Sequence, residues 1–325
     1  MKPPAPTWAI VTGCLWIGLL LGNASPLAAL PRAAAIPGGV VLLPLPGHEA
    51  ATQPPVARYQ GRRVMVVSAA LTGHPTSARW LAVVGIPLDA KVGPQRLEIE
   101  PGRQIDFTIG PAHYPEQHIT VTNQRQVTPL PDDLLRIERE RQQIDAAFDH
   151  WSSPILPVFT LAAPVEAPRS GTFGVRRFFN GQPRQPHSGL DLAAPRGTAI
   201  QAPAAGRVIE IGDYFFNGKT VLIDHGHGLV TLYCHLEQVD VQRGASVQAG
   251  DTLGRVGMSG RATAPHLHWA SVSTGSGSIR HCFCRRPSFS AFSHAPAAGG
   301  ACEAAARSAC SCARHRGSHR HGIPP

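Results

Sequence analysis

The chain has 325 residues, enough for about two domains of roughly 100–200 residues each, and 43% of them are apolar, which excludes a wholly disordered protein. It carries 33 Gly and 31 Pro but only 16% charged residues, a composition that favours turn-rich β structure over a helical bundle. The formal net charge of +9 does not indicate a nucleic-acid-binding protein, because residues 270–325 hold seven arginines and a single acidic residue, Glu303.

The N-terminus has the features of an export signal. Lys2 precedes an apolar run, Trp8–Leu21, which fits the core of a signal peptide and is shorter than the about 20 residues of a spanning helix. Small residues follow this run, so we predict a signal peptide over residues 1–29 with cleavage near Ala29. The alternative is an uncleaved N-terminal anchor. The rest of the chain is then expected to work outside the cytoplasm, in the periplasm or cell envelope.

A small N-terminal β domain is predicted next. Residues 30–56 are rich in Pro, Gly and Ala and are interpreted as a lead-in to it. Residues 57–130 contain short runs of alternating or β-branched residues separated by turn residues, which is typical of an all-β domain. The runs are Arg63–Ser68, Trp80–Val84, Gln95–Ile99, Gln104–Ile109 and His118–Val121.

Residues 131–152 predict a helix that connects two domains. Asp132 and Asp133 suit its N-terminus, because carboxylates accept hydrogen bonds from the free N–H groups there and oppose the helix dipole. Apolar residues at helical spacing predict one buried face. They are Leu134, Ile137, Ile144, Phe148 and Trp151.

Residues 153–269 return to short runs broken by glycine, which predicts a compact antiparallel sheet. The predicted fold class is therefore mainly β: a small N-terminal β domain, a connecting helix and a C-terminal antiparallel β-sheet domain. The runs of this second domain are Arg207–Ile211, Thr220–Asp224, Leu229–His235, Gly244–Gly250 and Asp251–Gly257.

The second domain also concentrates side chains that bind metals. His187 and Asp191 are separated by three residues, His266 and His268 by one, and His235 lies between the two pairs. Because residues i and i+2 of a strand point to the same face, His266 and His268 can reach one site. Three nitrogen and oxygen ligands leave one position open for water, as catalytic zinc sites require.

Residues 155–269 closely resemble the M23 family of zinc metallopeptidases, of the lysostaphin or LytM type. The residues before them resemble, in WLAVVGIPL and YPEQHITVTN, the N-terminal domain of some Gram-negative M23 endopeptidases. The resemblance implies a LytM-like antiparallel β-sheet peptidase domain. Its segments are FGVRRFFNGQPRQPHSGLDLAAPRGTAIQAPAAGRV (Phe173–Val208), GKTVLIDHGHGLVTLYCHLE (Gly218–Glu237) and GDTLGRVGMSGRATAPHLHW (Gly250–Trp269).

This resemblance implies that His187, Asp191 and His268 bind one Zn²⁺ ion per chain, and that His235 and His266 flank the metal-bound water. One of these two histidines would act as general base and the other would stabilise the oxyanion; which takes which role stays open. The implied reaction is hydrolysis of peptide crosslinks in peptidoglycan, at the D-alanyl–diaminopimelate bond if the cell is Gram-negative. Peptidoglycan stem peptides are the expected partner, nucleic acid is not, and the oligomeric state is unknown.

For several other residues of the same segment, a structural role competes with a functional one. His225 matches a family position that is not a ligand, and we expect a structural role for it. Cys234 alternates away from the His235 face and is expected to be packed rather than metal-bound. Arg177 and Asn180 either line the substrate groove or shape a turn.

The tail, residues 270–325, does not continue the family pattern after Trp269. It lacks periodicity and holds five of the seven cysteines. Under one choice of synonymous codons, restoring a single base after codon 269 gives HLHWGVSLNGLRVDPALFL, which resembles the normal family ending. We therefore hypothesise a single-base deletion or a sequencing error, which would truncate the peptidase domain at its last strand and leave an unpaired edge beside His268. The alternative is a genuine basic extension.

Two other functions compete with the endopeptidase. Some proteins of this fold have lost the zinc ligands and serve as binding modules that activate amidases, but this chain keeps all three ligands and both histidines. The second alternative is that the chain is an inactive product of a frameshifted gene. The nucleotide sequence at codons 269–270 would reveal this.

Overall fold

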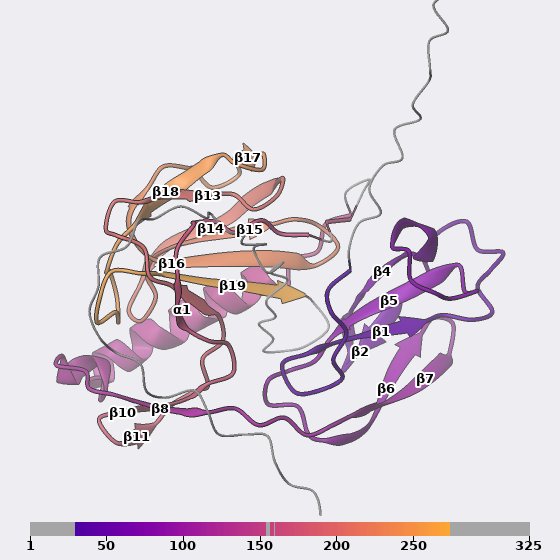
Figure 1. Cartoon of the computed structure of the whole chain (residues 1–325), viewed down its shortest axis with the longest axis horizontal. Coiled ribbons are helices and arrows are strands. Elements are labelled where there is room, and N and C mark those ends of the chain that lie inside the picture. The colour runs from indigo at the N-terminus through magenta and orange to yellow at the C-terminus, as the bar shows by residue number, and fades with distance from the viewer. Residues whose placement is uncertain (1–29, 154–156, 159, 274–325) are drawn as a thin grey trace, which may run out of the picture. The chain divides into compact units, whose positions relative to one another are not determined.

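A computed structural model of the protein describes residues 30–153, 157–158 and 160–273. The predicted signal peptide and residues 274–325 of the tail lie outside the described residues. The described chain consists of strands with one α-helix among them (Figure 1), so the predicted mainly β class is confirmed. No helix in these residues is apolar enough over a sufficient length to cross a bilayer.

The N-terminal region forms two small sheets around a common core. Their strand orders are β1-β5-β4 and β3-β2-β6-β7, and all of their pairings are antiparallel. Buried side chains of both sheets, such as Val84, Leu97 and Ile109, form one hydrophobic cluster. The strands are β1 (Val40–Pro44), β2 (Ala57–Tyr59), β3 (Arg62–Arg63), β4 (Met65–Ser68), β5 (Trp80–Gly85), β6 (Gly93–Ile99) and β7 (Arg103–Ile109).

Residues 30–56 are more than the lead-in that the sequence predicts. They contain β1, which pairs with β5 along its whole length, and Leu43 and Leu45 are buried in the cluster. The sequence does not predict this strand because Pro and Gly residues surround the run VVLLP. Pro44 ends it at a sheet edge, where a missing N–H donor is tolerated.

The last strand of the predicted N-terminal domain joins a different sheet. β8 (Glu116–Ile119) pairs in parallel with β10 (Arg176–Phe179), which forms a hairpin with β11 (Gln182–Pro183). Asn180 and Gly181 turn this hairpin with φ angles of 50° and 77°, values that Asn and Gly tolerate best. The Asn180 side chain also bonds the backbone of Val121, so it serves the turn rather than an open groove.

A nine-stranded antiparallel sheet forms the rest of the β structure. Its main path runs β17-β14-β15-β16-β19-β12-β9, and β18 joins β13 to β16. The strands are β9 (Arg169–Gly171), β12 (Leu190–Leu192), β13 (Ala199–Gln201), β14 (Gly206–Tyr214), β15 (Gly218–Asp224), β16 (Leu229–Val239), β17 (Ser246–Val247), β18 (Thr252–Val256) and β19 (Leu267–Ser273).

Strand β19 runs past Trp269, where the sequence predicts that the domain ends. Ala270 and Val272 are each 3% exposed and lie opposite residues of β16. The expected unpaired edge beside His268 is wrong for the described residues, because β16 and β12 occupy the two sides of β19. The alternating residues that follow Trp269 supply enough β propensity and apolar surface to complete the strand.

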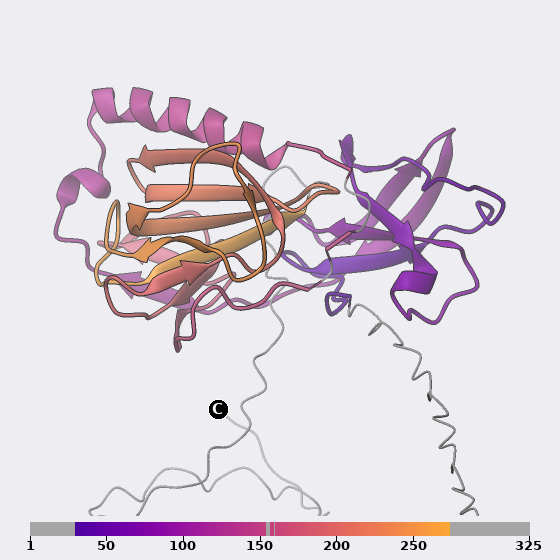
Figure 2. The ribbon, with the colours of Figure 1, turned by 90° about the horizontal axis from the view of Figure 1, so that it is seen from above.

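The helix α1 (Pro131–Phe148) lies along one face of the nine-stranded sheet (Figure 2). Ile144 and Phe148 pack against Leu232 and other residues of the sheet, so the helix covers the core besides connecting domains. The predicted apolar face is only partly correct. Leu134 is 54% exposed and Trp151 lies beyond the helix end, because only the C-terminal half of α1 meets apolar sheet residues.

The start of α1 has the predicted acidic cap. The Asp133 carboxylate accepts a hydrogen bond from the Leu130 N–H, 3.0 Å away, and binds the Arg125 guanidinium through both oxygens. The hydrogen bond from the Arg125 guanidinium lowers the pKa of Asp133, although burial has the opposite effect. A carboxylate at this position satisfies a free helix N–H group, which explains why the helix begins here.

Candidate metal centre

Three neighbouring strands bring two of the predicted ligands together. Asp191 of β12 lies opposite His268 of β19, and on its other side His268 lies opposite Cys234 of β16. Directly opposed residues of an antiparallel pair have Cβ atoms about 4.5–5.5 Å apart, so this register sets the Asp191 and His268 side chains next to one another. His187 reaches the same point from the segment that precedes β12.

One oxygen of Asp191 is the centre of the cluster. Asp191 Oδ1 lies 2.9 Å from His187 Nε2 and 2.9 Å from His268 Nδ1, and these two nitrogens are 3.0 Å apart. The candidate ligand atoms of the three residues all lie within 4.8 Å of one another. The His187 and Asp191 residues are buried, at 3% and 6% exposure.

The orientation of the His187 ring favours a cation at this point. His187 Nδ1 lies 2.8 Å from the Thr172 carbonyl oxygen, which can only accept, so Nδ1 carries the proton. In the neutral ring Nε2 then presents a lone pair toward Asp191 Oδ1, which is also an acceptor. Two acceptors at 2.9 Å repel one another unless a positive charge lies between or beside them.

Asp191 is stabilised as a carboxylate by any positive charge at this point, whether protons on the rings or a cation supply it. Burial alone would raise the pKa of its carboxyl group, but hydrogen bonds and positive charge from protonated His187 and His268 would outweigh burial and hold that pKa far below its usual range. Asp191 is therefore ionised at every physiological pH. Nitrogen, nitrogen and carboxylate oxygen form a donor set that suits zinc, so the residues present fit this ion.

His235 and His266 lie beside the three clustered residues. The His235 ring centroid is 4.8 Å from that of His266 and 6.1 Å from that of His268, and His266 Nε2 is 3.8 Å from Asp191 Oδ1. The structure thus brings all five predicted site residues together. His235 has a φ of 66°, a backbone conformation that non-glycine residues seldom adopt and that is often found at functional sites.

Both of these histidines are held through Nδ1. His235 Nδ1 lies 2.8 Å from the Ser259 carbonyl oxygen, and His266 Nδ1 lies 2.8 Å from the Ala264 carbonyl oxygen. Each Nδ1 therefore carries a proton, and each neutral ring keeps a lone pair on Nε2. Burial, together with the neighbouring charges of His266 and His268, lowers the pKa of His235 to about 3.

Arg177 is a site residue that the sequence left ambiguous. Its guanidinium donates to Asp191 Oδ2 over 2.6 Å, and the Arg177 side chain is only 18% exposed. The two oxygens of Asp191 thus have different surroundings, because Oδ2 is held by Arg177 while Oδ1 faces the histidines. The sequence gives no signal for this pair, since β10 and β12 belong to different sheets and their residues meet only in the folded protein.

Two glycines provide space for the cluster and were not singled out from the sequence. A Cβ atom at Gly189 would lie 2.7 Å from His268 Nε2, and one at Gly171 would lie 2.3 Å from Asp191 Oδ2. Both distances are shorter than van der Waals contact. Any side chain at these positions would displace the side chain of a proposed ligand.

The remaining polar residues of the segment have structural surroundings. His225 is buried, with Nδ1 2.7 Å from the Ala205 carbonyl oxygen and Nε2 2.8 Å from Thr231 Oγ1, as its predicted structural role requires. Cys234 is 1% exposed and packs in the cluster beneath α1. Tyr233 is fully buried and bonds Thr231 rather than His235.

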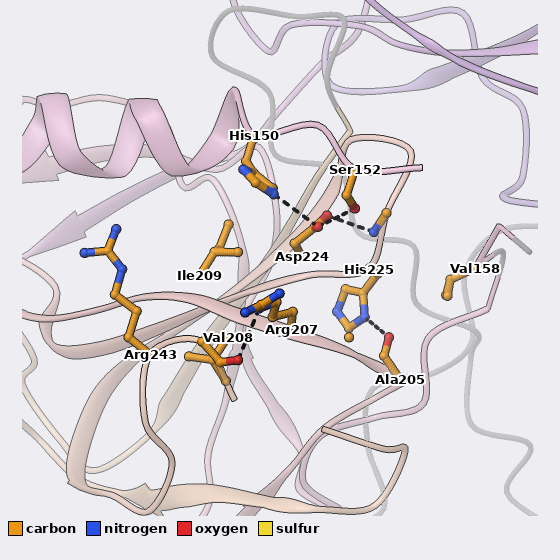
Figure 3. Close-up of a pocket in the computed structure, with 13 residues that line it drawn as sticks. His150, Ser152, Val158, Ala205, Arg207, Val208, Ile209, Asp224, His225 and Arg243 are labelled. Carbon is orange, nitrogen blue, oxygen red and sulfur yellow. Dashed lines mark hydrogen bonds and ion pairs between the residues drawn. The ribbon is translucent and has the colours of Figure 1, made fainter. Parts of the chain in front are cut away.

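A separate cavity of about 530 Å³ lies at the other end of β15 (Figure 3). The His235 N–H bonds the carbonyl of Asn217, just before β15, whereas Asp224 at the end of the strand lines the cavity. Seven residues at about 3.3 Å each separate these ends by roughly 20 Å. In the cavity, Asp224 accepts hydrogen bonds from Ser152 Oγ (2.5 Å) and the Gly226 N–H (2.8 Å).

Comparison with protein families gives two matches. Residues 185–278 match the family described as Peptidase family M23, and residues 33–112 match the Peptidase family M23 N-terminal domain. The first match contains all five clustered residues and extends past both Trp269 and the end of β19.

Similar proteins agree with these matches. A crystal structure of a Pseudomonas aeruginosa protein described as a peptidase M23 is 43% identical, covers 76% of this chain and 92% of that one, and superposes with a TM-score of 0.61. The peptidoglycan DD-endopeptidase ShyC of Vibrio cholerae is 40% identical over 119 residues, and the DD-carboxypeptidase/endopeptidase Mpg of Neisseria meningitidis is 40% identical over 89. These segments cover 35% and 27% of this chain, but only 27% and 20% of the two relatives.

Proposed function

The chain belongs to peptidase family M23, and we propose on this basis that it is an exported zinc-dependent endopeptidase that hydrolyses peptide crosslinks of peptidoglycan. The relatives named as peptidoglycan DD-endopeptidases support the substrate class. The predicted signal peptide supports export to the periplasm or cell envelope. In a Gram-negative cell the bond cleaved is the D-alanyl–diaminopimelate bond.

His187, Asp191 and His268 are the proposed zinc ligands. Their donor atoms converge within 4.8 Å, and this convergence is the observation that carries the proposal. When bound, zinc lowers the pKa of a coordinated water toward about 7 and polarises the scissile carbonyl group. Thr172 fixes the His187 ring and Arg177 fixes the outer oxygen of Asp191, so the chain holds its ligand atoms in place before the metal arrives.

His235 and His266 are the proposed catalytic histidines. Each has a neutral Nε2 directed to the site because a backbone carbonyl holds its Nδ1–H, so either ring can accept a proton from the attacking water. The same ring can return that proton to the leaving amine. The other ring can donate a hydrogen bond to the developing oxyanion when its Nε2 carries a proton, a state that burial opposes at His235.

The test is a digest of purified peptidoglycan with the full chain, followed by separation of the muropeptides by mass. The expected result is loss of crosslinked dimers, abolished by a chelator and restored by added zinc. A version with the reading frame restored after codon 269 serves as the comparison. Folded, zinc-loaded chains of both kinds that leave the dimers intact would contradict the peptidase and favour a binding module.

Cleavage by the frame-restored chain alone would retain the proposal for the family site and assign the failure to residues 270–325. Cleavage by both chains would show that the tail is dispensable. Zinc content, measured by metal analysis of each purified chain, separates a missing metal from a missing catalytic group.

A further inference from the structure

Three arginines, of which Arg177 contacts the metal centre, lie close enough for their charges to interact, and among the described residues only Arg177 is paired with a carboxylate. Arg177 is bound to Asp191, as described above. Arg184 lies three residues before His187, and its backbone N–H donates to the carbonyl of Arg177 over 2.9 Å. Arg261 lies in the loop that leads to His266.

The Arg261 guanidinium is clamped between two aromatic rings. Its central carbon lies 4.1 Å from the ring centroid of Phe216 and 4.6 Å from that of Phe179. Within the described residues, its side chain donates to the backbone carbonyl of Gln126 over 3.3 Å and makes no ion pair. The stacking holds the planar group rigid, which lowers the entropy cost of binding a planar anion.

Arg184 is likewise without a carboxylate among the described residues. Its guanidinium donates to the carbonyls of Pro183 and Val127 and to the Gln182 side chain. Burial and the positive charges of Arg184 and Arg177 lower the pKa of Arg261 to about 10. Repulsion between these like charges raises the free energy of the folded protein, and a bound anion would lower that free energy.

We propose that Arg184 and Arg261 form a subsite for a free carboxylate of the peptide substrate, next to the scissile bond. The inference rests on the proposed function, because it assigns a place to one group of that substrate. The carbonyl of Ser259, two residues before Arg261, holds the His235 ring. Phe179, on which Arg261 stacks, lies two residues after Arg177, which holds Asp191. The Arg184 backbone bonds that of Arg177, so these contacts tie both arginines to residues that hold the site. Arginine is the side chain that best matches the planar geometry of a carboxylate.

Crosslink chemistry supplies a suitable carboxylate. Diaminopimelate has two centres, each with one amine and one acid, and the amine of one centre forms the amide with D-alanine. The acid of that same centre stays free and is attached one carbon from the scissile nitrogen. A subsite for it would distinguish a true crosslink from an amide that lacks an adjacent charge.

A purely structural role for the two arginines is the competing explanation. Both donate to backbone carbonyls of residues 126–127, so they also fasten this segment to the peptidase sheet. A structural role would affect all substrates equally, whereas a carboxylate subsite affects only substrates that carry the charge. The experiment therefore compares two substrates that differ at one group.

The first experiment measures kcat/KM of the full, zinc-loaded chain on a crosslinked stem-peptide dimer and on the same dimer with the adjacent carboxylate converted to a primary amide. We expect the unaltered chain to prefer the acid by about 10- to 100-fold, the usual value of hydrogen bonds to a charged group. In Arg184→Gln and Arg261→Gln the ratio of the two rates should fall toward 1, because the rate on the acid drops more than the rate on the amide. Arg243→Gln is the matched control, since Arg243 is an exposed arginine that lines the distant cavity.

Equal loss on both substrates in the two variants, or no preference in the unaltered chain, would overturn the subsite while leaving the peptidase intact. A second measurement uses the chelated chain and an uncrosslinked diaminopimelate stem peptide, in acid and amide forms, with binding followed by calorimetry. Tighter binding of the acid that depends on Arg184 and Arg261 supports the subsite even if no dimer is cleaved. Equal binding of both forms overturns it.

Discussion

Two clusters of similar side chains, one near each end of β15, are arranged for different purposes. Near the start of the strand, His187, Asp191 and His268 direct acceptor atoms to one point. At its far end, Asp224 lies among groups of the same chemistry, but Ser152 Oγ donates to it over 2.5 Å and the Gly226 N–H over 2.8 Å, while His150 Nε2 lies 3.4 Å away (Figure 3).

The difference shows that residue type alone does not make a metal centre. A carboxylate surrounded by donors is satisfied by the protein itself, whereas a carboxylate that faces lone pairs requires a cation. The two clusters therefore predict opposite responses to the same kind of substitution.

The largest effect is expected for His268→Ala. Loss of a ligand should abolish zinc binding and reduce peptidoglycan hydrolysis by more than about 100-fold, since even groups that only support a ligand are worth 10- to 100-fold. Metal analysis and the muropeptide digest measure the two outcomes. Full zinc content in this variant would remove His268 from the ligand set.

His235→Gln should reduce kcat by about 10²–10⁴-fold and leave the zinc content unchanged, because it removes a proton acceptor and no ligand. His225→Gln is the matched control, because His225 is also buried but is fully bonded to Ala205 and Thr231. A similar loss of activity in both variants would mean that the His235 effect comes from misfolding.

Arg177→Met should weaken zinc binding by about 10- to 100-fold, because Asp191 Oδ2 would lose the donor that orients it. A competition titration with a chelator measures the affinity. Arg176→Met is the control, since its neighbour Arg176 is exposed and pairs with Glu116 at 2.9 Å instead. Unchanged zinc affinity in Arg177→Met would show that Asp191 binds the metal without the hydrogen bond from Arg177.

Asp224→Ala should lower the free energy of unfolding by about 1–3 kcal/mol, because it leaves the Gly226 N–H and Ser152 Oγ without their acceptor. Denaturant unfolding measures this change. Zinc content and activity should stay as in the unaltered chain, in contrast to His268→Ala. Loss of zinc here would mean that the two ends of β15 are coupled.

The smallest effect concerns pH. Burial lowers the pKa of His225 from its ordinary 6.5, so the unfolded chain binds the proton more readily. The stability that depends on neutral His225 is present above pH 6.5 and is lost as the pH falls below it, by about 1.4 kcal/mol per pH unit at most. His225→Gln should flatten the curve of unfolding free energy against pH in this window. An unchanged slope of unfolding free energy against pH would show that the loss of stability comes from other titrating groups.

Much of the sheet could be predicted because its signal is local. Alternation and turn residues placed β5 and β7 within a few residues, and the same pattern located β14, β15 and β16. β1 was missed because Pro and Gly dominate its surroundings, and the exposed half of α1 was misjudged because helical spacing does not reveal what packs against a helix.

The sequence by itself determined which side chains were available: the pair His187 and Asp191, the pair His266 and His268, and His235 are motifs of a few residues that carry their own chemistry. Only the tertiary structure decided how they meet. Asp191 and His268 are 77 residues apart and become neighbours through strand register, and Arg177 joins them through packing alone. The glycines at 171 and 189 are required for the same reason, because the space that each must leave belongs to a side chain brought there by another strand.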